Sequence, residues 1–133
     1  MKKISLILLL ISFLNANCQD AAKKLAGKTW YANGDILRSE KVQLYALKPA
    51  GFAPEVKFLA DQNLQLKTDT AGDFTFVCLY RFKNNKVKIY YTERIESAKG
   101  QVKEEEIAHY YNIRALPNSP NFELEPITAG DFK

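Results

Sequence analysis

Apolar and polar side chains alternate along most of the chain after residue 27. The clearest run places a bulky or apolar side chain at every second position: Phe74, Phe76, Cys78, Tyr80 and Phe82. A period of two residues is typical of a β-strand with one buried face, whereas an amphipathic helix repeats every 3.6 residues. The alternation therefore predicts a chain that folds mainly into strands.

Runs of this kind recur at short spacing and are separated by turn residues. The expected strands cover residues 28–32, 41–48, 55–60, 63–67, 74–82, 86–91, 107–116 and 122–127. Residues 36–38 are expected to extend the first strand beyond a turn at Asn33-Gly34. Asn84-Asn85 predicts a tight hairpin, because asparagine tolerates a positive φ. Residues 97–106 are polar and predict a charged connection rather than a strand.

About eight short strands and no long helix indicate an all-β sandwich or barrel. We expect an eight-stranded antiparallel up-and-down barrel. Its short connections allow neighbouring strands to pair, and closure removes exposed strand edges. A short N-terminal helical turn over residues 21–26, ended by Gly27, is expected to precede the first strand.

The first residues follow a different pattern, that of an export signal. Lys2 and Lys3 precede an uncharged apolar run from Ile4 to Leu14, and the first acidic residue is Asp20. As a helix this run rises only ~16 Å, about half of a ~30 Å hydrocarbon core. A basic start, a short apolar run and small residues after it are typical of signal peptides. We therefore expect residues 1–18 to be a signal peptide.

Cys18 follows this segment directly, and two processing routes are open. The run from Leu14 to Cys18 resembles the lipobox of bacterial lipoproteins, in which the cysteine is acylated and becomes the mature N-terminus. That resemblance implies lipidation of Cys18 and a membrane tether. Asn15 and Asn17 depart from the lipobox pattern, so ordinary cleavage after Ala16 or Cys18 is the alternative. We expect the protein in the periplasm or lipid-anchored at the outer membrane, with secretion as the alternative.

Residues 19–133 are enough for one domain and not for two. Loss of Lys2 and Lys3 with the signal lowers the formal net charge from +4 to +2, and this near balance argues against a nucleic-acid partner. Cys78 is interpreted as a small buried hydrophobic residue rather than part of a disulfide framework. We expect the domain to be a monomer.

The start of this domain resembles that of small bacterial lipocalin-like (calycin-type) proteins. The run Leu25-Ala26-Gly27-Lys28-Thr29-Trp30 resembles their short turn, glycine and tryptophan, although one extra residue separates Gly27 from Trp30. Residues 58–66 and 110–124 resemble their strand–turn–strand and last hairpin. The resemblance implies a barrel over residues 19–133 with one closed end, one open end and often a small apolar ligand. It also implies that Trp30 closes one end beneath a basic side chain, for which Arg114 is the candidate.

The sequence provides no convincing catalytic or metal-binding group of residues. His109, the only histidine, is expected on a strand face with Ile107 and Tyr111, as a core or rim residue. A Cys78–His109 pair lacks any supporting local sequence, and one histidine with few cysteines cannot build a zinc site. We therefore expect no enzyme activity, no metal and no cofactor.

Inward-facing aromatic residues are the most suggestive feature for function. The candidate ligand-binding residues are Phe74, Phe76, Tyr80, Tyr91 and Tyr111. Eight-stranded barrels lie at the limit between a filled core and a small cavity, so both remain open. The leading hypothesis is an exported lipocalin-like protein of the cell envelope that binds a small apolar or amphipathic ligand. The alternative is a filled barrel that acts as an interaction or inhibitor module of an envelope complex, through the loop with Phe52 and a basic stripe that includes Arg81, Lys86 and Lys88.

Overall fold

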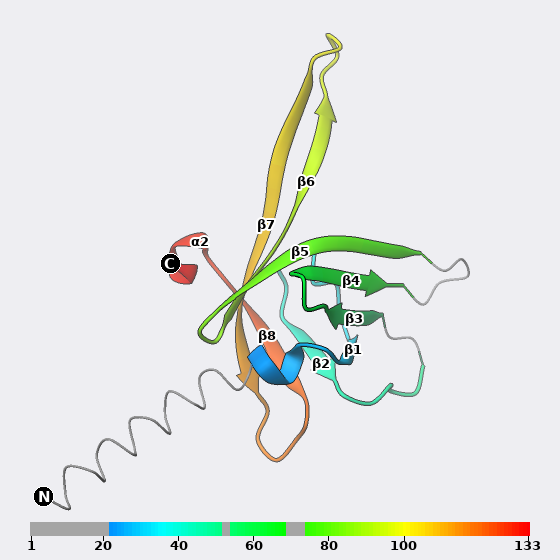
Figure 1. Ribbon diagram of the computed structural model, residues 1–133, viewed down its shortest axis with the longest axis vertical. Coiled ribbons are helices and arrows are strands. Elements are labelled where there is room, and N and C mark those ends of the chain that lie inside the picture. Colours follow the sequence, from blue (N-terminus) through cyan, green and yellow to red (C-terminus); the bar gives the residue numbers. More distant parts are fainter. Residues whose placement is uncertain (1–21, 52–53, 69–73) are drawn as a thin grey trace, which may run out of the picture.

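The computed structural model describes residues 22–51, 54–68 and 74–133. Eight strands form a closed antiparallel barrel (Figure 1), so the expected fold class is confirmed. The strands are β1 (Thr29–Ala32), β2 (Val42–Tyr45), β3 (Glu55–Phe58), β4 (Asn63–Lys67), β5 (Thr75–Lys83), β6 (Lys86–Glu96), β7 (Val102–Ala115) and β8 (Phe122–Ile127). A helical turn covers residues 22–25, and the short helix α2 (Ala129–Phe132) follows β8. The expected signal peptide, including Cys18, lies outside the described residues.

The strands run up and down in chain order from β3 to β8, and the first two strands close the barrel. The order around it is β1-β2-β8-β7-β6-β5-β4-β3. β1 therefore lies between β2 and β3. Tyr31 pairs with Tyr45 at the end of β2 and with Glu55 at the start of β3. Tyr45 and Glu55 thus flank the same residue of β1 from opposite sides. The connection from β2 to β3 must therefore cross from one side of β1 to the other.

The buried core follows the predicted alternation. The inward side chains that are at most 5% exposed include Val42, Leu44, Val56, Phe58, Leu64, Cys78, Tyr80, Val87, Ile89, Tyr111, Ile113, Phe122 and Leu124. Burial of a side chain of this size contributes on the order of 1.5–3 kcal/mol. The expected hairpin at Asn84-Asn85 is confirmed, and Asn84 has the positive φ of 56° that its residue type tolerates.

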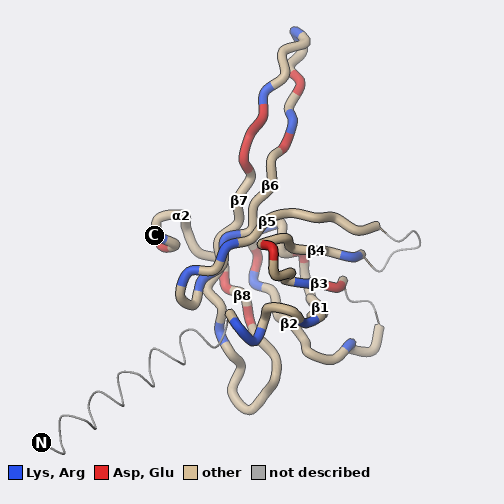
Figure 2. The backbone as a smooth tube through the Cα atoms, viewed as in Figure 1, with Lys and Arg blue, Asp and Glu red and all other residues tan. Residues whose placement is uncertain are grey.

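β6 and β7 are longer than the sequence predicted, and together they project from the barrel as a two-stranded ribbon (Figure 1). The predicted connection over residues 97–106 is wrong in its second half, because residues 102–106 belong to β7. These positions pair with β6, and Arg94 lies opposite Glu104. Figure 2 shows charged residues along both strands of the ribbon. Charged side chains suit a strand whose two faces both meet water, so polarity here does not indicate a loop.

One end of the barrel is filled and closed. The Trp30 indole Nε1–H donates a hydrogen bond of 3.0 Å to the carbonyl of Leu25, which is fully buried in the helical turn below. Phe122 packs edge-on against the Trp30 ring at 5.4 Å. Arg114 does not cover Trp30 as expected: it is exposed and bonds Glu123 on the outer face. Ile113 takes the inward position on this part of β7, so its neighbour must point outward.

The basic stripe on the outside of β5 and β6 is largely occupied by other parts of the same chain. Lys86 Nζ donates to the carbonyl of Asp131 in α2, and the Arg81 guanidinium lies 5.6 Å above the buried ring of Phe132. Lys88 pairs with Glu106 at 3.3 Å. α2 therefore covers part of the surface that the sequence offered as an interaction site, and Phe52 of the other proposed surface lies outside the described residues.

Candidate functional site

The loop of residues 33–41, between β1 and β2, covers the other end of the barrel. Residues 36–38 form part of this loop and do not extend β1 as expected. Ile36 inserts into the core and is 2% exposed. The Tyr111 hydroxyl donates a hydrogen bond of 2.5 Å to the Ile36 carbonyl, and Ser39 Oγ lies 2.6 Å from Nδ1 of His109. Two inward-facing residues of β7, His109 and Tyr111, thus bind the loop from inside the barrel.

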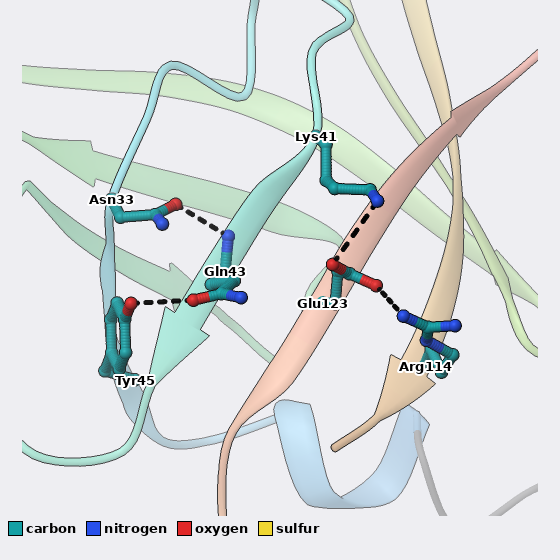
Figure 3. A network of polar contacts seen from close by, with 6 residues as sticks. All are labelled: Asn33, Lys41, Gln43, Tyr45, Arg114 and Glu123. Carbon is teal, nitrogen blue, oxygen red and sulfur yellow. Dashed lines mark hydrogen bonds and ion pairs between the residues drawn. The ribbon is translucent and has the colours of Figure 1, made fainter.

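The base of the loop is fixed on the outer face of the barrel (Figure 3). At its start, the Asn33 side-chain oxygen accepts a 2.7 Å hydrogen bond from the backbone N–H of Gln43. At its end, Lys41 lies 3.8 Å from Glu123, whose other carboxylate oxygen accepts a 2.5 Å bond from Arg114. The Glu123 side chain is 6% exposed, and a buried carboxylate of this kind requires such partners. The loop is therefore held at its base as well as at its middle.

A cavity of about 350 Å³ lies beneath the loop, and we call it the loop cavity. Its apolar walls come from the loop and from four strands, through Ala32, Ile36, Leu37, Val56, Leu66 and Phe76. Asp35, Lys67 and Thr68 complete the lining. An apolar chamber with a few polar groups is the usual composition of a small-molecule site.

Two of the predicted binding residues line this cavity. Phe76 belongs to its wall and is half-buried, whereas Phe74 is 66% exposed. Phe74 was expected to point inward like the other alternating aromatics, but it precedes the first residue of β5 and lies outside the regular alternation. Its ring still contributes to the cavity lining.

The remaining predicted residues lie around the cavity or away from it. Tyr91 packs edge-on against Phe76 at 5.5 Å and stacks over His109 at 6.5 Å. Tyr111 holds the loop rather than lining the cavity. Tyr80 lies toward the closed end, where its ring contacts Phe58 at 5.1 Å and its hydroxyl donates to the carbonyl of Leu59. The structure therefore groups Phe74, Phe76, Tyr91 and Tyr111 around the loop end and leaves Tyr80 apart.

The cavity residues that sequence reasoning missed are those of the loop. Ile36 and Leu37 were assigned to the first strand because they are apolar and follow it closely. A signal was present: the two residues stand alone in a polar stretch, with Asp35 before them and Arg38 after them. Asp35 accepts a 2.9 Å hydrogen bond from the backbone N–H of Leu37, which favours a turn over an extended strand.

His109 is the one buried polar group at this end with an unsatisfied atom in the described part of the chain. The residue is 9% exposed, and its Nε2 has no hydrogen-bond partner. Burial lowers the pKa of His109 below 6.5, and the charge of Asp35 opposes this only in part. The imidazole is therefore neutral at pH 7 and serves as a contact for Ser39.

Cys78 is free, 3% exposed and surrounded by the core, as expected. Burial raises the pKa of its thiol to about 12, so no thiolate is present for nucleophilic chemistry at neutral pH. Within residues 22–51, 54–68 and 74–133, no group of three or more His, Cys, Asp or Glu side chains is placed to hold a metal ion. No helix in these ranges is long and apolar enough to cross a membrane.

A second, wider space lies where β5 and β6 separate. The two strands pair from Lys83–Lys86 to Leu79–Tyr90 and then diverge. The resulting β5–β6 opening has a volume of about 530 Å³ and is lined by both strands, including Phe76, Val77, Tyr91 and Arg94. It is bordered by polar and apolar groups alike, in contrast to the loop cavity.

Comparisons with protein-family models, curated proteins and solved structures find no match for this chain. The barrel is compatible with a lipocalin-like fold, and a fold by itself does not determine a function.

Proposed function

We propose that the protein binds a small apolar or amphipathic ligand in the loop cavity. The observation that carries this proposal is the apolar chamber of about 350 Å³ beneath residues 33–41. Small-molecule sites generally have volumes of about 300–1,000 Å³ and mainly apolar walls. Each Å² of apolar ligand surface removed from water contributes about 25 cal/mol, so apolar contact supplies most of the affinity.

The lining also suggests how the ligand is oriented. The walls formed by Val56, Leu66 and Phe76 exclude a fully polar molecule, because its groups would lose water without gaining partners. Asp35 belongs to the lining, and its half-exposed carboxylate also pairs with Arg38 at 3.3 Å. An amphipathic ligand would place its apolar part against the walls and its polar part near Asp35.

The loop is the proposed gate of this site. The cavity already opens to solvent beside the exposed Phe74, and movement of the middle of the loop would widen this entrance. That movement breaks the contacts of Ile36 with Tyr111 and of Ser39 with His109. Each such hydrogen bond contributes only about 0.5–1.5 kcal/mol, so opening is accessible without unfolding the barrel. In this proposal the residues act by binding alone, and no catalytic step is assigned to them.

The setting of this activity is part of the proposal. The N-terminal pattern supports export, and the position of Cys18 supports a lipid tether to the outer membrane. A lipocalin-like carrier in the cell envelope would combine such a tether with an open-ended barrel. Intact-mass measurement of the exported protein tests both, since lipidation at Cys18 adds acyl mass and removes residues 1–17.

Titration of the purified protein with a hydrophobic fluorophore tests the binding site. Saturable binding is expected for the natural sequence, and Leu66→Trp should weaken it at least about tenfold, because the larger ring fills the chamber. Val77→Trp is the matched control, since Val77 lies two residues into β5, is 52% exposed and does not line the loop cavity. Equal binding by the natural protein and Leu66→Trp would place the probe elsewhere and contradict the proposal.

A further inference from the structure

The β6–β7 ribbon has two strand edges that no other described strand covers. Its pairs run from Tyr91–Ile107 to Glu96–Val102, beyond the last pairs that β6 makes with β5 and that β7 makes with β8. Isolated two-stranded ribbons are marginally stable, and free edges are templates for pairing with another chain. Each of the two edges could therefore pair with a strand of a second chain.

The free backbone groups of β6 belong to its even-numbered residues. The N–H of Ser97 donates 2.8 Å to the carbonyl of Gln101, across the turn toward β7. Hydrogen-bonding direction alternates along an antiparallel strand, so odd residues of β6 bond β7. Thr92, Arg94 and Glu96 consequently direct their N–H and C=O groups away from β7, toward the free side.

The side chains on this edge select one way to pair with a second, antiparallel copy. A two-fold axis at Glu93, Arg94 or Glu96 would place that residue against its own copy, with like charges opposed. An axis at Thr92 leaves only residues 91–93 to pair, because Tyr90 already pairs with Leu79 of β5. An axis at Ile95 instead places Ile95 opposite Ile95 of the other copy. It also places Arg94 of each copy opposite Glu96 of the other, so that the ion pair forms twice. Opposite charges and apolar pairs facing each other stabilise neighbouring strands, whereas like charges destabilise them.

The free edge of β7 offers no register of equal length. Its stretch Lys103-Glu104-Glu105-Glu106 opposes like charges when the axis lies at any of these four residues. An axis at Val102 avoids like charges but leaves only residues 101–103 to pair before the turn at residues 98–100. Charged residues on an exposed edge are a common protection against unwanted pairing. The ribbon thus has one edge that repels its own copy and one that is complementary to it.

We infer that β6 is a self-association surface, through which two copies of the chain join edge to edge about a two-fold axis at Ile95. The joint forms a four-stranded sheet of two ribbons, with the barrels at its far ends and both loop cavities uncovered. Ile95 is 42% exposed in the single chain and gains an apolar contact in the pair. This inference replaces the monomer expected from sequence and does not depend on ligand binding.

The paired edge between the two β6 strands is short, so the association is weak. Stable protein interfaces bury about 1,200–2,000 Å², more than a few residues on one edge can supply. We therefore expect a reversible dimer that forms as the protein concentration rises. A tether that confines the protein to one surface would raise its effective concentration and favour the pair.

Charge exchange across the joint provides the first test, by sedimentation equilibrium at protein concentrations up to about 1 mM. Arg94→Glu and Glu96→Arg each oppose like charges and should weaken dimerisation at least about tenfold. Because Arg94 also lies opposite Glu104 within the ribbon, the charge-exchanged variant Arg94→Glu/Glu96→Arg carries Glu104→Arg as well. It restores opposite charges across the joint and within the ribbon and should recover dimerisation. A natural protein that stays monomeric throughout, or a charge-exchanged variant as weak as the single ones, would overturn the inference.

Cross-linking tests the register directly. Ile95 on the axis forms a non-hydrogen-bonded pair, in which Cα atoms lie about 4.5 Å apart, within disulfide range. Ile95→Cys should form a covalent dimer under mild oxidation, above the level of the natural protein. Val102→Cys, which is 47% exposed on β7, is the matched control and should not. Equal cross-linking of both variants would indicate random collision, and capture of a different protein chain through Ile95→Cys in place of a dimer would also refute self-association.

Discussion

The two ends of the barrel are built from the same alternating strands but differ in how they are filled. At the closed end, Trp30, Phe58, Tyr80 and Phe122 pack ring against ring. The indole and phenol groups there donate to the backbone carbonyls of Leu25 and Leu59. At the other end the loop of residues 33–41 replaces these rings, and a cavity of about 350 Å³ remains beneath it.

The difference shows that alternation determines which side chains point inward, while the connections determine how much space remains. Leu25 closes one end because a helical turn presents it to the core. Ile36 enters the other end from a loop and fills it only in part. Three contrasts between these ends are open to experiment.

The largest effect is expected at the closed end. Phe58→Ala removes a fully buried ring and should lower the free energy of unfolding by about 3–5 kcal/mol. Phe76→Ala, at the half-buried wall of the loop cavity, should cost clearly less, because a space is already present there. Urea denaturation of both variants measures the difference. Equal losses would mean that the two ends are packed alike.

A smaller and more local effect is expected at the loop. Tyr111→Phe leaves the Ile36 carbonyl without its donor and should cost about 1–3 kcal/mol. Hydrogen exchange should accelerate in residues 33–41 more than elsewhere. Tyr80→Phe is the control, since it removes a hydroxyl donor at the other end. Faster exchange of the loop in both variants would argue against a specific hold by Tyr111.

The smallest effect is expected for the dependence of stability on pH. Burial holds the pKa of His109 below 6.5, so between 6.5 and that lower pKa the unfolded chain binds a proton that the folded chain does not. Stability should therefore fall as the pH drops from 7 to 5, and the Tm should fall with it. His109→Gln should lose less over the same range. A Tm that is constant in the natural protein, or that falls equally in both, would exclude His109 as the cause.

Much of the fold could be predicted from the sequence because the buried positions repeat every second residue. The strand from Thr75, the hairpin at Asn84-Asn85 and the inward positions of Val56 and Phe58 all follow from that pattern. The ribbon over residues 92–106 could not be predicted in the same way. Its strands have no buried face, so alternation of apolar residues is absent and only cross-strand pairing reveals them.

The cavity was less accessible to prediction than the fold. Phe74 and Phe76 were expected to bind ligand, and both line the cavity. The contribution of Ile36 depends on a loop that folds back over the barrel, held by Tyr111, which is 75 residues away in the chain. Local patterns do not contain contacts between such distant positions. The same limit applies to Arg114, whose partner Glu123 is set by the register of β7 and β8.

The position of β1 between β2 and β3 has a consequence for how the molecule folds. The strands from β3 to β8 can assemble through successive hairpins, whose contacts close short loops quickly. The seam of β2 with β8 joins Val42 to Leu124 and carries a much larger loop-closure entropy. The β2–β8 seam is therefore expected to form last, whereas β1 can join β2 and β3 earlier because both strands lie close to it in the chain.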